Sequence, residues 1–407
     1  MTTHTVPPAK PFRRRVFYIP GYDPIPPRRY RELYRTEGAD QARISGYALT
    51  LQPKTTPGPY GWRVTSTATE ADFDVLVWSD IVRASMDQGI AATYLQLIRT
   101  AWAYIGSGAL YRLMHLRKGP MIAALYPIGM LLLQLALALT AAYGAYAMGS
   151  VLHPALGLVA AVTTAALLLR LFRAYDNRFY AYYLMHDYAF TAQLHGANPP
   201  ALETRITDFR HLITAALAPD ALTPDVDEVL VVGHSSGAHL AVSILADLIR
   251  AGLPPNAPPL AFLSLGQVVP MISFLPRANR LRADLKYLSS RSELTWIDIT
   301  APGDGCAFAL CDPVSVTGVS PPDKRWPLVI SAAFTQTLSP ARWKSLRWRF
   351  FRLHFQYLCA FDALAGGPGD YDYFQITAGP ITLQKRYENR APSKSRIETP
   401  RSGHTAT

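Results

Sequence analysis

The clearest chemical pattern in the sequence is the pentapeptide at residues 233–237, which reads Gly-His-Ser-Ser-Gly and matches G-x-S-x-G. A short β-branched run at residues 228–232 precedes it, and small residues suited to close helix packing follow it. This order predicts a strand, a tight turn and a helix, with the Ser235 hydroxyl exposed on the turn as a nucleophile. The alternative is a serine that only caps a helix, but a cap requires neither the flanking glycines nor the preceding strand.

This strand–serine–helix segment resembles the nucleophile elbow of the α/β-hydrolase superfamily of serine esterases and lipases. The resemblance implies a mostly parallel sheet flanked by helices, with Ser235 as nucleophile and the Ser236 amide as one oxyanion donor. Residues 18–23 resemble the strand-to-loop turn that supplies the second donor, and the Tyr22 amide is the candidate. The family often has a His-Gly pair at this turn, where this chain has Pro20 and Gly21.

A serine nucleophile needs a base, and the resemblance implies the chain order serine, acid, histidine. The histidines that follow Ser235 are His239, His354 and His404. His239 lies on the helix predicted after the serine, and His404 lies in a polar C-terminal stretch, so His354 is the candidate base. A helical pattern runs from about residue 341 towards His354, whereas the family places its histidine on a loop. One unbroken helix through His354 would therefore argue against this role.

The orienting acid should follow the strand predicted at residues 294–299. Asp304 lies just beyond this strand in a loop rich in Gly and Pro, and it is the first candidate. Asp298, inside the strand, is the second candidate, and Asp312 is the third. The acid would hold the imidazole in one tautomer and stabilise the imidazolium that forms when Ser235 loses its proton.

The rest of the sequence alternates strand and helix patterns, which predicts an α/β fold. The predicted strands cover residues 15–20, 62–68, 71–78, 228–232, 259–265, 294–299 and 327–330. The predicted helices cover residues 90–116, 177–194 and 201–217.

An uncharged apolar run interrupts this alternation. Residues 121–169 contain no Asp, Glu, Lys or Arg. A membrane crossing needs about 20 apolar residues, so this run is long enough for two crossings. We expect two transmembrane helices near residues 121–148 and 151–171, joined by a short turn. In agreement, apolar residues make up 49% of the 407-residue chain and charged residues only 17%, against a typical charged share of about 25%. A pair of buried core helices is the alternative.

Basic residues flank this hairpin on both sides. Arg112, Arg117 and Lys118 precede it, and three arginines follow it at positions 170, 173 and 178. The positive-inside rule then predicts an integral protein of the inner or plasma membrane, with both termini and the catalytic domain in the cytoplasm. The expected organisation is an α/β-hydrolase domain at 13–118 and 174–389, the hairpin at 119–173, and disordered tails at 1–12 and 390–407.

The segment at residues 341–353 carries five basic residues and no acidic one, interleaved with Trp343, Trp348, Phe350 and Phe351. Such a composition is typical of an interfacial helix on an anionic membrane. Nucleic acid is the rival partner for a chain with 40 basic and 29 acidic residues and a net charge of +11. Next to a transmembrane hairpin we expect lipid, and no nucleic acid.

These features predict a membrane-anchored serine hydrolase that cleaves carboxyl esters through an acyl-enzyme, with an acyl-ester small molecule or lipid as substrate. No metal or organic cofactor is expected, and no oligomeric state is indicated. Cys306, Cys311 and Cys359 form neither a disulfide framework nor a metal set, although Cys306 and Cys311 could pair. A non-catalytic membrane scaffold, a partner-binding protein and an acyltransferase with the same three residues are the alternatives.

Overall fold

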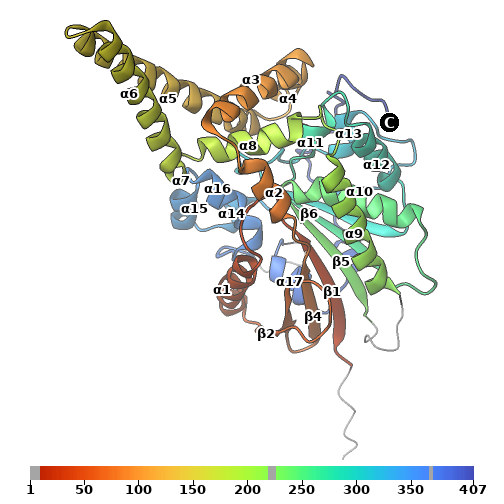
Figure 1. Ribbon diagram of the computed structural model, residues 1–407. Coiled ribbons are helices and arrows are strands. Elements are labelled where there is room, and N and C mark those ends of the chain that lie inside the picture. Colours follow the sequence, from red (N-terminus) through yellow and green to blue (C-terminus); the bar gives the residue numbers. More distant parts are fainter. Residues whose placement is uncertain (1–9, 219–225, 366–369) are drawn as a thin grey trace, which may run out of the picture.

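A computed structural model describes residues 10–218, 226–365 and 370–407. Its centre is an eight-stranded sheet in the order β2-β3-β4-β1-β5-β6-β7-β8 (Figure 1). The strands from β4 to β8 in this order are parallel, and β2 and β3 are antiparallel. The bounds are β1 Phe12–Ile19, β2 Thr50–Pro53, β3 Gly61–Thr65, β4 Thr69–Val75, β5 Glu228–His234, β6 Leu260–Leu265, β7 Leu294–Thr300 and β8 Leu328–Ser331. The predicted α/β class with a mostly parallel sheet is confirmed.

Helices cover both faces of the sheet, because alternate residues of the central strands are apolar on each side. Phe17 and Ile19 of β1 join a core with α2, α9, α10 and α12, whereas Val16 and Tyr18 join a core with α1 and α17. The helices are α1 Arg28–Ser45, α2 Ser79–Met86, α3 Ile90–Gly106, α4 Ala109–Met114, α5 Lys118–Ser150, α6 Pro154–Ala174, α7 Asp176–Phe179, α8 Ala181–Ala192, α9 Pro200–Leu217, α10 Gly237–Arg250, α11 Val269–Ser273, α12 Asn279–Ser289, α13 Pro313–Thr317, α14 Phe334–Thr337, α15 Pro340–Leu346, α16 Phe350–His354, the 3₁₀ helix Gln356–Leu358, α17 Tyr373–Ala378 and α18 Leu383–Tyr387.

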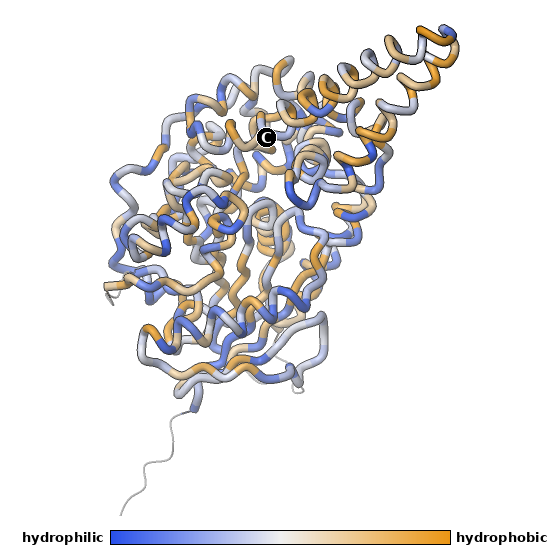
Figure 2. The backbone as a smooth tube through the Cα atoms, turned by 90° about the vertical axis from the view of Figure 1, so that its left-hand side faces the viewer, coloured by the Kyte–Doolittle hydropathy of each residue, from blue (hydrophilic) through white to orange (hydrophobic). Residues whose placement is uncertain are grey.

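The apolar run folds into two paired helices, α5 and α6, that project from the body of the molecule (Figures 1 and 2). His153 caps α6 by accepting the Ala155 amide at 3.1 Å, and Pro154 occupies the first turn. Near the tip, a methyl group at Gly149 would lie 2.9 Å from the Gly157 Cα, so small residues let the two backbones approach closely. Both helices are long and apolar enough to cross a membrane, by length and composition.

Several element boundaries differ from those expected. The pattern at residues 90–116 splits into α3 and α4 at Gly108, which has a positive φ of 70°. The pattern from residue 341 towards His354 is also broken, into α15 and α16. The edge strand β2 was not predicted. Phe12 already belongs to β1, while the rest of the expected N-terminal tail up to residue 9 lies outside the described residues.

The expectation of a disordered tail at residues 390–407 is wrong. Ser393 donates its amide to the Val329 carbonyl of β8 at 2.9 Å, and Asp312 donates its amide to the Ile397 carbonyl at 2.9 Å. Near the end of the chain, the buried Arg282 donates to the Ala406 carbonyl at 2.7 Å. The backbone of the segment therefore finds partners along β8 and α13, which a polar composition does not reveal.

A buried ion pair ties the two central strands to the C-terminal part of the chain. Arg14 of β1 donates to Glu228 of β5 at 2.6 Å, and both side chains are almost fully buried. Arg14 also donates to the Gly379 carbonyl, and Glu228 accepts the Leu383 amide at 2.6 Å. Removal of one partner would leave the other charge buried and uncompensated, which is the costly case for an ion pair.

We therefore predict that Glu228→Ala lowers the free energy of unfolding by about 3–5 kcal/mol. The matched control is Glu70→Ala, on the same sheet, because Glu70 pairs with Arg13 at 3.8 Å and remains partly exposed. This control should cost less than about 1 kcal/mol. Urea unfolding of the purified protein in detergent measures both values. Equal losses in the two variants would contradict the role of the buried pair.

Candidate active site

Ser235 lies on the turn between β5 and α10, as predicted. Its φ is +55°, a strained value for a residue with a side chain. The turn is held on both sides, because Ser235 donates its amide to the Leu265 carbonyl at 2.9 Å and accepts the Ala238 amide at 3.1 Å. Strain of this kind persists only where the surrounding structure enforces it, and it is concentrated at functional sites.

The glycines around Ser235 are required by close backbone contacts. A methyl group at Gly237 would lie 2.1 Å from the Ile19 carbonyl oxygen, and one at Gly233 would lie 2.7 Å from the Ala238 Cα. At Gly21, on the loop after β1, a methyl group would lie 2.9 Å from the Ser235 Cβ. These contacts bring the loop after β1, the end of β5 and the start of α10 together around one hydroxyl.

Asp304 and His354 form a hydrogen-bonded pair at the same edge of the sheet. Nδ1 of His354 donates to Oδ2 of Asp304 at 2.7 Å. Asp304 lies in the loop after β7, and His354 is the last residue of α16, which follows β8. The three predicted residues therefore lie on segments that follow β5, β7 and β8. Because α15 and α16 are separate helices, the objection raised by an unbroken helix does not apply.

Asp304 is buried, and its carboxylate is well supplied with donors. Its Oδ1 accepts the Cys306 amide at 2.9 Å, and its Oδ2 also accepts the Tyr357 hydroxyl at 3.0 Å. Burial works to raise the pKa of Asp304, but His354 and these donors outweigh it, so the pKa lies below its ordinary value. The acid is thus held as a carboxylate, the form that orients an imidazole.

His354 and Ser235 lie at neighbouring points of this edge. A methyl group at Gly266, directly after β6, would lie 3.1 Å from the His354 Cε1, and Ser235 donates its amide to the residue before Gly266. His354 Nε2 remains available on the far side from the Asp304 bond. Among the described residues, the Ser235 hydroxyl has no hydrogen-bond partner. Catalytic hydrogen bonds are often long without substrate and tighten only in the complex.

The two predicted oxyanion donors lie on opposite sides of the turn. Ser236 directly precedes α10, and Tyr22 lies on the loop after β1 next to Gly21. Within the described residues, neither backbone amide donates a hydrogen bond. Tyr22 is held in place because its carbonyl accepts the Tyr183 hydroxyl at 2.6 Å. The arrangement leaves two amides free to bind a negative oxygen.

Two side chains that support the base were not predicted. His234 is buried and donates from Nε2 to the His354 carbonyl at 3.0 Å. Burial and the neighbouring His354 lower its pKa to about 3, so it stays neutral. Tyr357, besides contacting Asp304, accepts the Ala301 amide at 3.0 Å. His239 is buried and its Nδ1 has no described partner.

The other two acid candidates lie away from His354. Asp298 is buried inside β7 and accepts the Ser264 hydroxyl at 2.6 Å; burial raises its pKa to about 8. Asp312 caps α13 by accepting the Val314 and Ser315 amides. Asp304 is therefore the acid that the fold brings to the candidate base.

The three cysteines are free, so the alternative pairing of Cys306 with Cys311 is not formed. Potential ligand atoms of Asp304, Cys306 and His354 lie within 4.8 Å of one another. However, Asp304 and His354 are already bonded to each other, and burial with two nearby carboxylates raises the pKa of the Cys306 thiol well above its ordinary value. This thiol is held in its neutral form.

A second carboxyl approaches His354 from α8. Asp187 is half-buried, and it makes no side-chain hydrogen bond or ion pair with the described residues. Burial raises its pKa to about 7, while the nearby His354 acts to lower it. Tyr183, one turn earlier on α8, is the residue that contacts the Tyr22 carbonyl. Helix α8 therefore covers the site, and no feature of its sequence indicated this.

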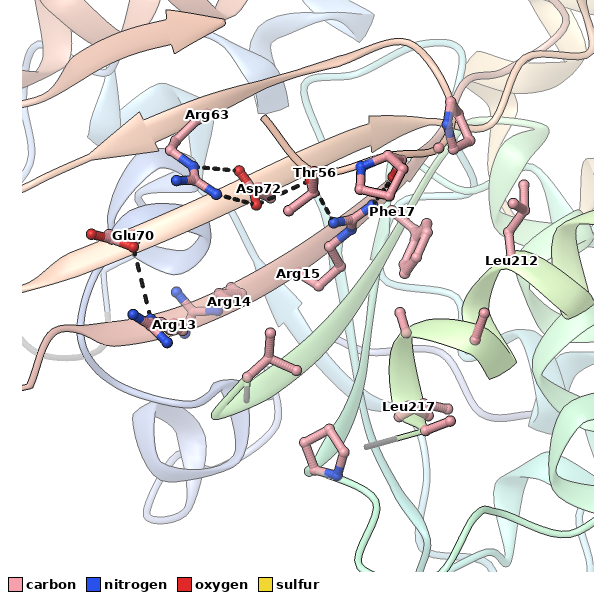
Figure 3. A pocket seen from close by; sticks show the side chains of 18 of the residues that line it. Arg13, Arg14, Arg15, Phe17, Thr56, Arg63, Glu70, Asp72, Leu212 and Leu217 are labelled. Carbon is pink, nitrogen blue, oxygen red and sulfur yellow. Dashed lines mark hydrogen bonds and ion pairs between the residues drawn. The ribbon is translucent and has the colours of Figure 1, made fainter. Parts of the chain in front are cut away.

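A cavity of about 540 Å³ lies elsewhere, at the amino end of β1 (Figure 3). Its charged lining is largely paired, since Arg63 contacts Asp72 at 2.7 Å and Arg15 contacts Asp74 at 2.5 Å. Ser235 lies at the opposite end of the sheet. This cavity therefore has no part in the chemistry of the candidate active site.

Neither a protein-family model, nor a curated protein, nor a solved structure matches this chain.

Asp187 provides a test through pH. Its raised pKa means that the folded protein binds this proton more tightly than the unfolded chain does, so the resulting stability is present below about pH 4 and is lost as the pH rises through about 7. We predict that Asp187→Asn reduces the fall in melting temperature between about pH 5 and about pH 8.

The matched control for this prediction is Asp208→Asn, an exposed position on α9. It should follow the wild-type profile. Asp298, whose pKa is also raised, is present in all three proteins, so the difference between profiles isolates Asp187. Identical profiles for the wild type and Asp187→Asn would show that this carboxyl titrates as it does in the unfolded chain.

Proposed function

We propose that this protein is a membrane-anchored serine hydrolase that cleaves carboxyl esters, including lipid-derived ones, on an α/β-hydrolase fold. The observation that carries the proposal is the 2.7 Å bond between His354 and Asp304, at the same edge of the sheet as the strained Ser235 turn. An isolated G-x-S-x-G match does not predict a bonded Asp–His pair at the edge of the sheet where the serine turn lies.

The topology around the site supports the fold assignment. The nucleophile candidate follows a central parallel strand, and the chain order is Ser235, Asp304, His354, the order of α/β-hydrolases. The loop after β1, the strand beside β5, supplies the second amide, at Tyr22. The sheet continues into antiparallel strands on the β2 side.

The reaction follows from the positions of these groups. Ser235 Oγ attacks the ester carbonyl carbon while His354 Nε2 takes its proton, and Asp304 stabilises the imidazolium. The Ser236 and Tyr22 amides bind the oxyanion of the tetrahedral intermediate, each donor of this kind being worth about 10²–10³ in rate. Collapse expels the alcohol with the proton from His354, and water then releases the acyl group from Ser235 by the same steps.

The membrane anchor is proposed from the α5–α6 hairpin. Only 22% of the most apolar window of α5 and 6% of that of α6 is buried, whereas a core helix in a soluble protein would be covered. Lys118 at the start of α5 and Arg170 and Arg173 near the end of α6 flank the apolar part. Under the positive-inside rule, the hydrolase domain and both termini are cytoplasmic.

The position of the site supports a lipid-derived substrate. Strands β1 and β5 point towards α8 and the base of the hairpin (Figure 1), and α8 follows the hairpin after the short α7. Phe351 of the basic aromatic segment packs against Tyr180 with ring centroids 4.9 Å apart, and against Tyr183 at 5.9 Å. The basic aromatic segment therefore lies between the hairpin base and the active site.

Labelling with a fluorophosphonate tests the nucleophile. We predict that the probe labels the purified wild-type protein in detergent or liposomes and that Ser235→Ala abolishes labelling, because only an activated serine reacts. The control is Ser236→Ala, which removes the neighbouring hydroxyl and keeps the backbone amide. It should still be labelled. A wild-type protein that stays unlabelled in a native membrane would favour the non-catalytic scaffold.

A second prediction concerns the acid. Asp304→Asn preserves the shape of the side chain but favours the wrong histidine tautomer, so we expect kcat for a soluble p-nitrophenyl ester to fall by about 10⁴-fold. Asp298→Asn, the control carboxyl inside β7, should change kcat far less. The reverse ranking of the two variants would identify Asp298 as the acid.

A further inference from the structure

Helix α3 carries an exposed apolar stripe that the hairpin does not include. Leu95, Ile98, Trp102 and Ile105 recur at helical spacing, and the last three are 63%, 75% and 63% exposed. The following α4 adds Tyr111 and Met114, which are also exposed. The only charged residue of α3 is Arg99. A large exposed apolar surface on a protein usually marks a contact with a membrane or with another molecule.

The opposite face of α3 is firmly packed, so the stripe is not a loosely attached segment. Leu97 and Ala103 are buried. The Tyr104 hydroxyl donates to the Met271 carbonyl at 3.1 Å. At the other end, the Tyr94 hydroxyl donates to the Leu131 carbonyl of α5 at 3.0 Å. The helix is thus fixed to the hairpin and to the hydrolase body at the same time.

Cations accompany the stripe at the base of the hairpin. An open cavity of about 640 Å³ is lined by Ile90 at the start of α3 and by Arg170, Arg173 and Ala174 of α6. Both arginines are exposed, and neither pairs with an acid among the described residues. The apolar end of α3 and two unpaired guanidinium groups therefore line the same cavity. This combination suits the phosphate groups of lipids, which lie directly above the apolar acyl chains.

The basic aromatic segment lies beside the base of the hairpin as well. Trp348 is 71% exposed and Phe350 is also exposed, next to the exposed Arg347, Arg349 and Arg352. This segment reaches the hairpin base through the Phe351 contact with Tyr180. Aromatic side chains with neighbouring cations therefore occur both on α3 and on this segment.

We infer that α3 lies in the plane of the membrane interface, with its Leu95–Ile98–Trp102–Ile105 stripe among the acyl chains and headgroups of an anionic phospholipid bilayer. The inference rests on the proposed membrane anchor and adds a second contact that the hairpin alone does not require. Continuity with the hairpin, an aromatic residue at the centre of the stripe and unpaired arginines beside it favour a bilayer over a protein partner. The hydrolase body then lies directly against the bilayer.

The test uses single cysteines labelled with an environment-sensitive NBD fluorophore in the full-length protein, reconstituted into vesicles of phosphatidylcholine and phosphatidylglycerol. Ile98→Cys and Ile105→Cys report on α3, Leu158→Cys on the exposed face of α6, and Thr207→Cys on the exposed face of α9. The unsubstituted chain gives the background from the native cysteines. Nitroxide lipids labelled near the headgroup or deep in the acyl chain quench the fluorophore.

An in-plane helix is buried only about 5–10 Å, so we expect roughly twofold stronger quenching at positions 98 and 105 by the shallow nitroxide than by the deep one. Position 158 should be quenched by lipid as part of the hairpin, and position 207 should not be quenched. Quenching at 158 without quenching at 98 and 105 would overturn the in-plane helix while leaving the anchor intact. No quenching at 158 would overturn the anchor itself. NBD at 98 that is shielded from water yet unquenched, in a protein that elutes as a dimer, would assign the stripe to a second copy.

Discussion

The close approach of α10 to β1 is the constraint on which the candidate site depends. With a side chain at Gly237, the helix start would collide with the Ile19 carbonyl, and the turn that holds Ser235 at positive φ would not close. The same approach places the loop after β1 next to the serine. One packing contact therefore holds the strained turn at the candidate nucleophile next to the loop that carries the second candidate oxyanion donor.

The hairpin is connected to the candidate site through a short hydrogen-bonded path. Asp176 of α7 accepts the amides of Tyr182 and Tyr183 at 2.9 and 3.0 Å, which fixes the start of α8 directly after α6. The Tyr183 hydroxyl then holds the Tyr22 carbonyl. A tilt of the hairpin would thus be passed to the loop that carries one candidate oxyanion donor. The hairpin, which projects from the body, is thus linked to the candidate site by hydrogen bonds.

The sequence could predict the residues that end strands, and it could not predict those that join distant segments. Ser235 and Asp304 each follow an apolar β run and lie in a turn rich in glycine, so local pattern places them. His234 supports a residue 120 positions later, and Asp187 reaches the site only because α8 folds over it. The order of residues 390–407 likewise depends on backbone partners on β8 and α13, which composition does not encode.

The two carboxyls near His354 are driven apart in pKa by their surroundings, an arrangement that separates roles in enzymes. Asp304 accepts three hydrogen bonds and is held ionised, whereas Asp187 has no described donor and titrates near 7. In the proposed mechanism, Asp304 alone faces the imidazolium in acidic solution, where Asp187 is protonated. Above pH 7, Asp187 adds a second negative charge near His354, which in the proposed mechanism would stabilise the imidazolium and oppose an anionic intermediate on Ser235.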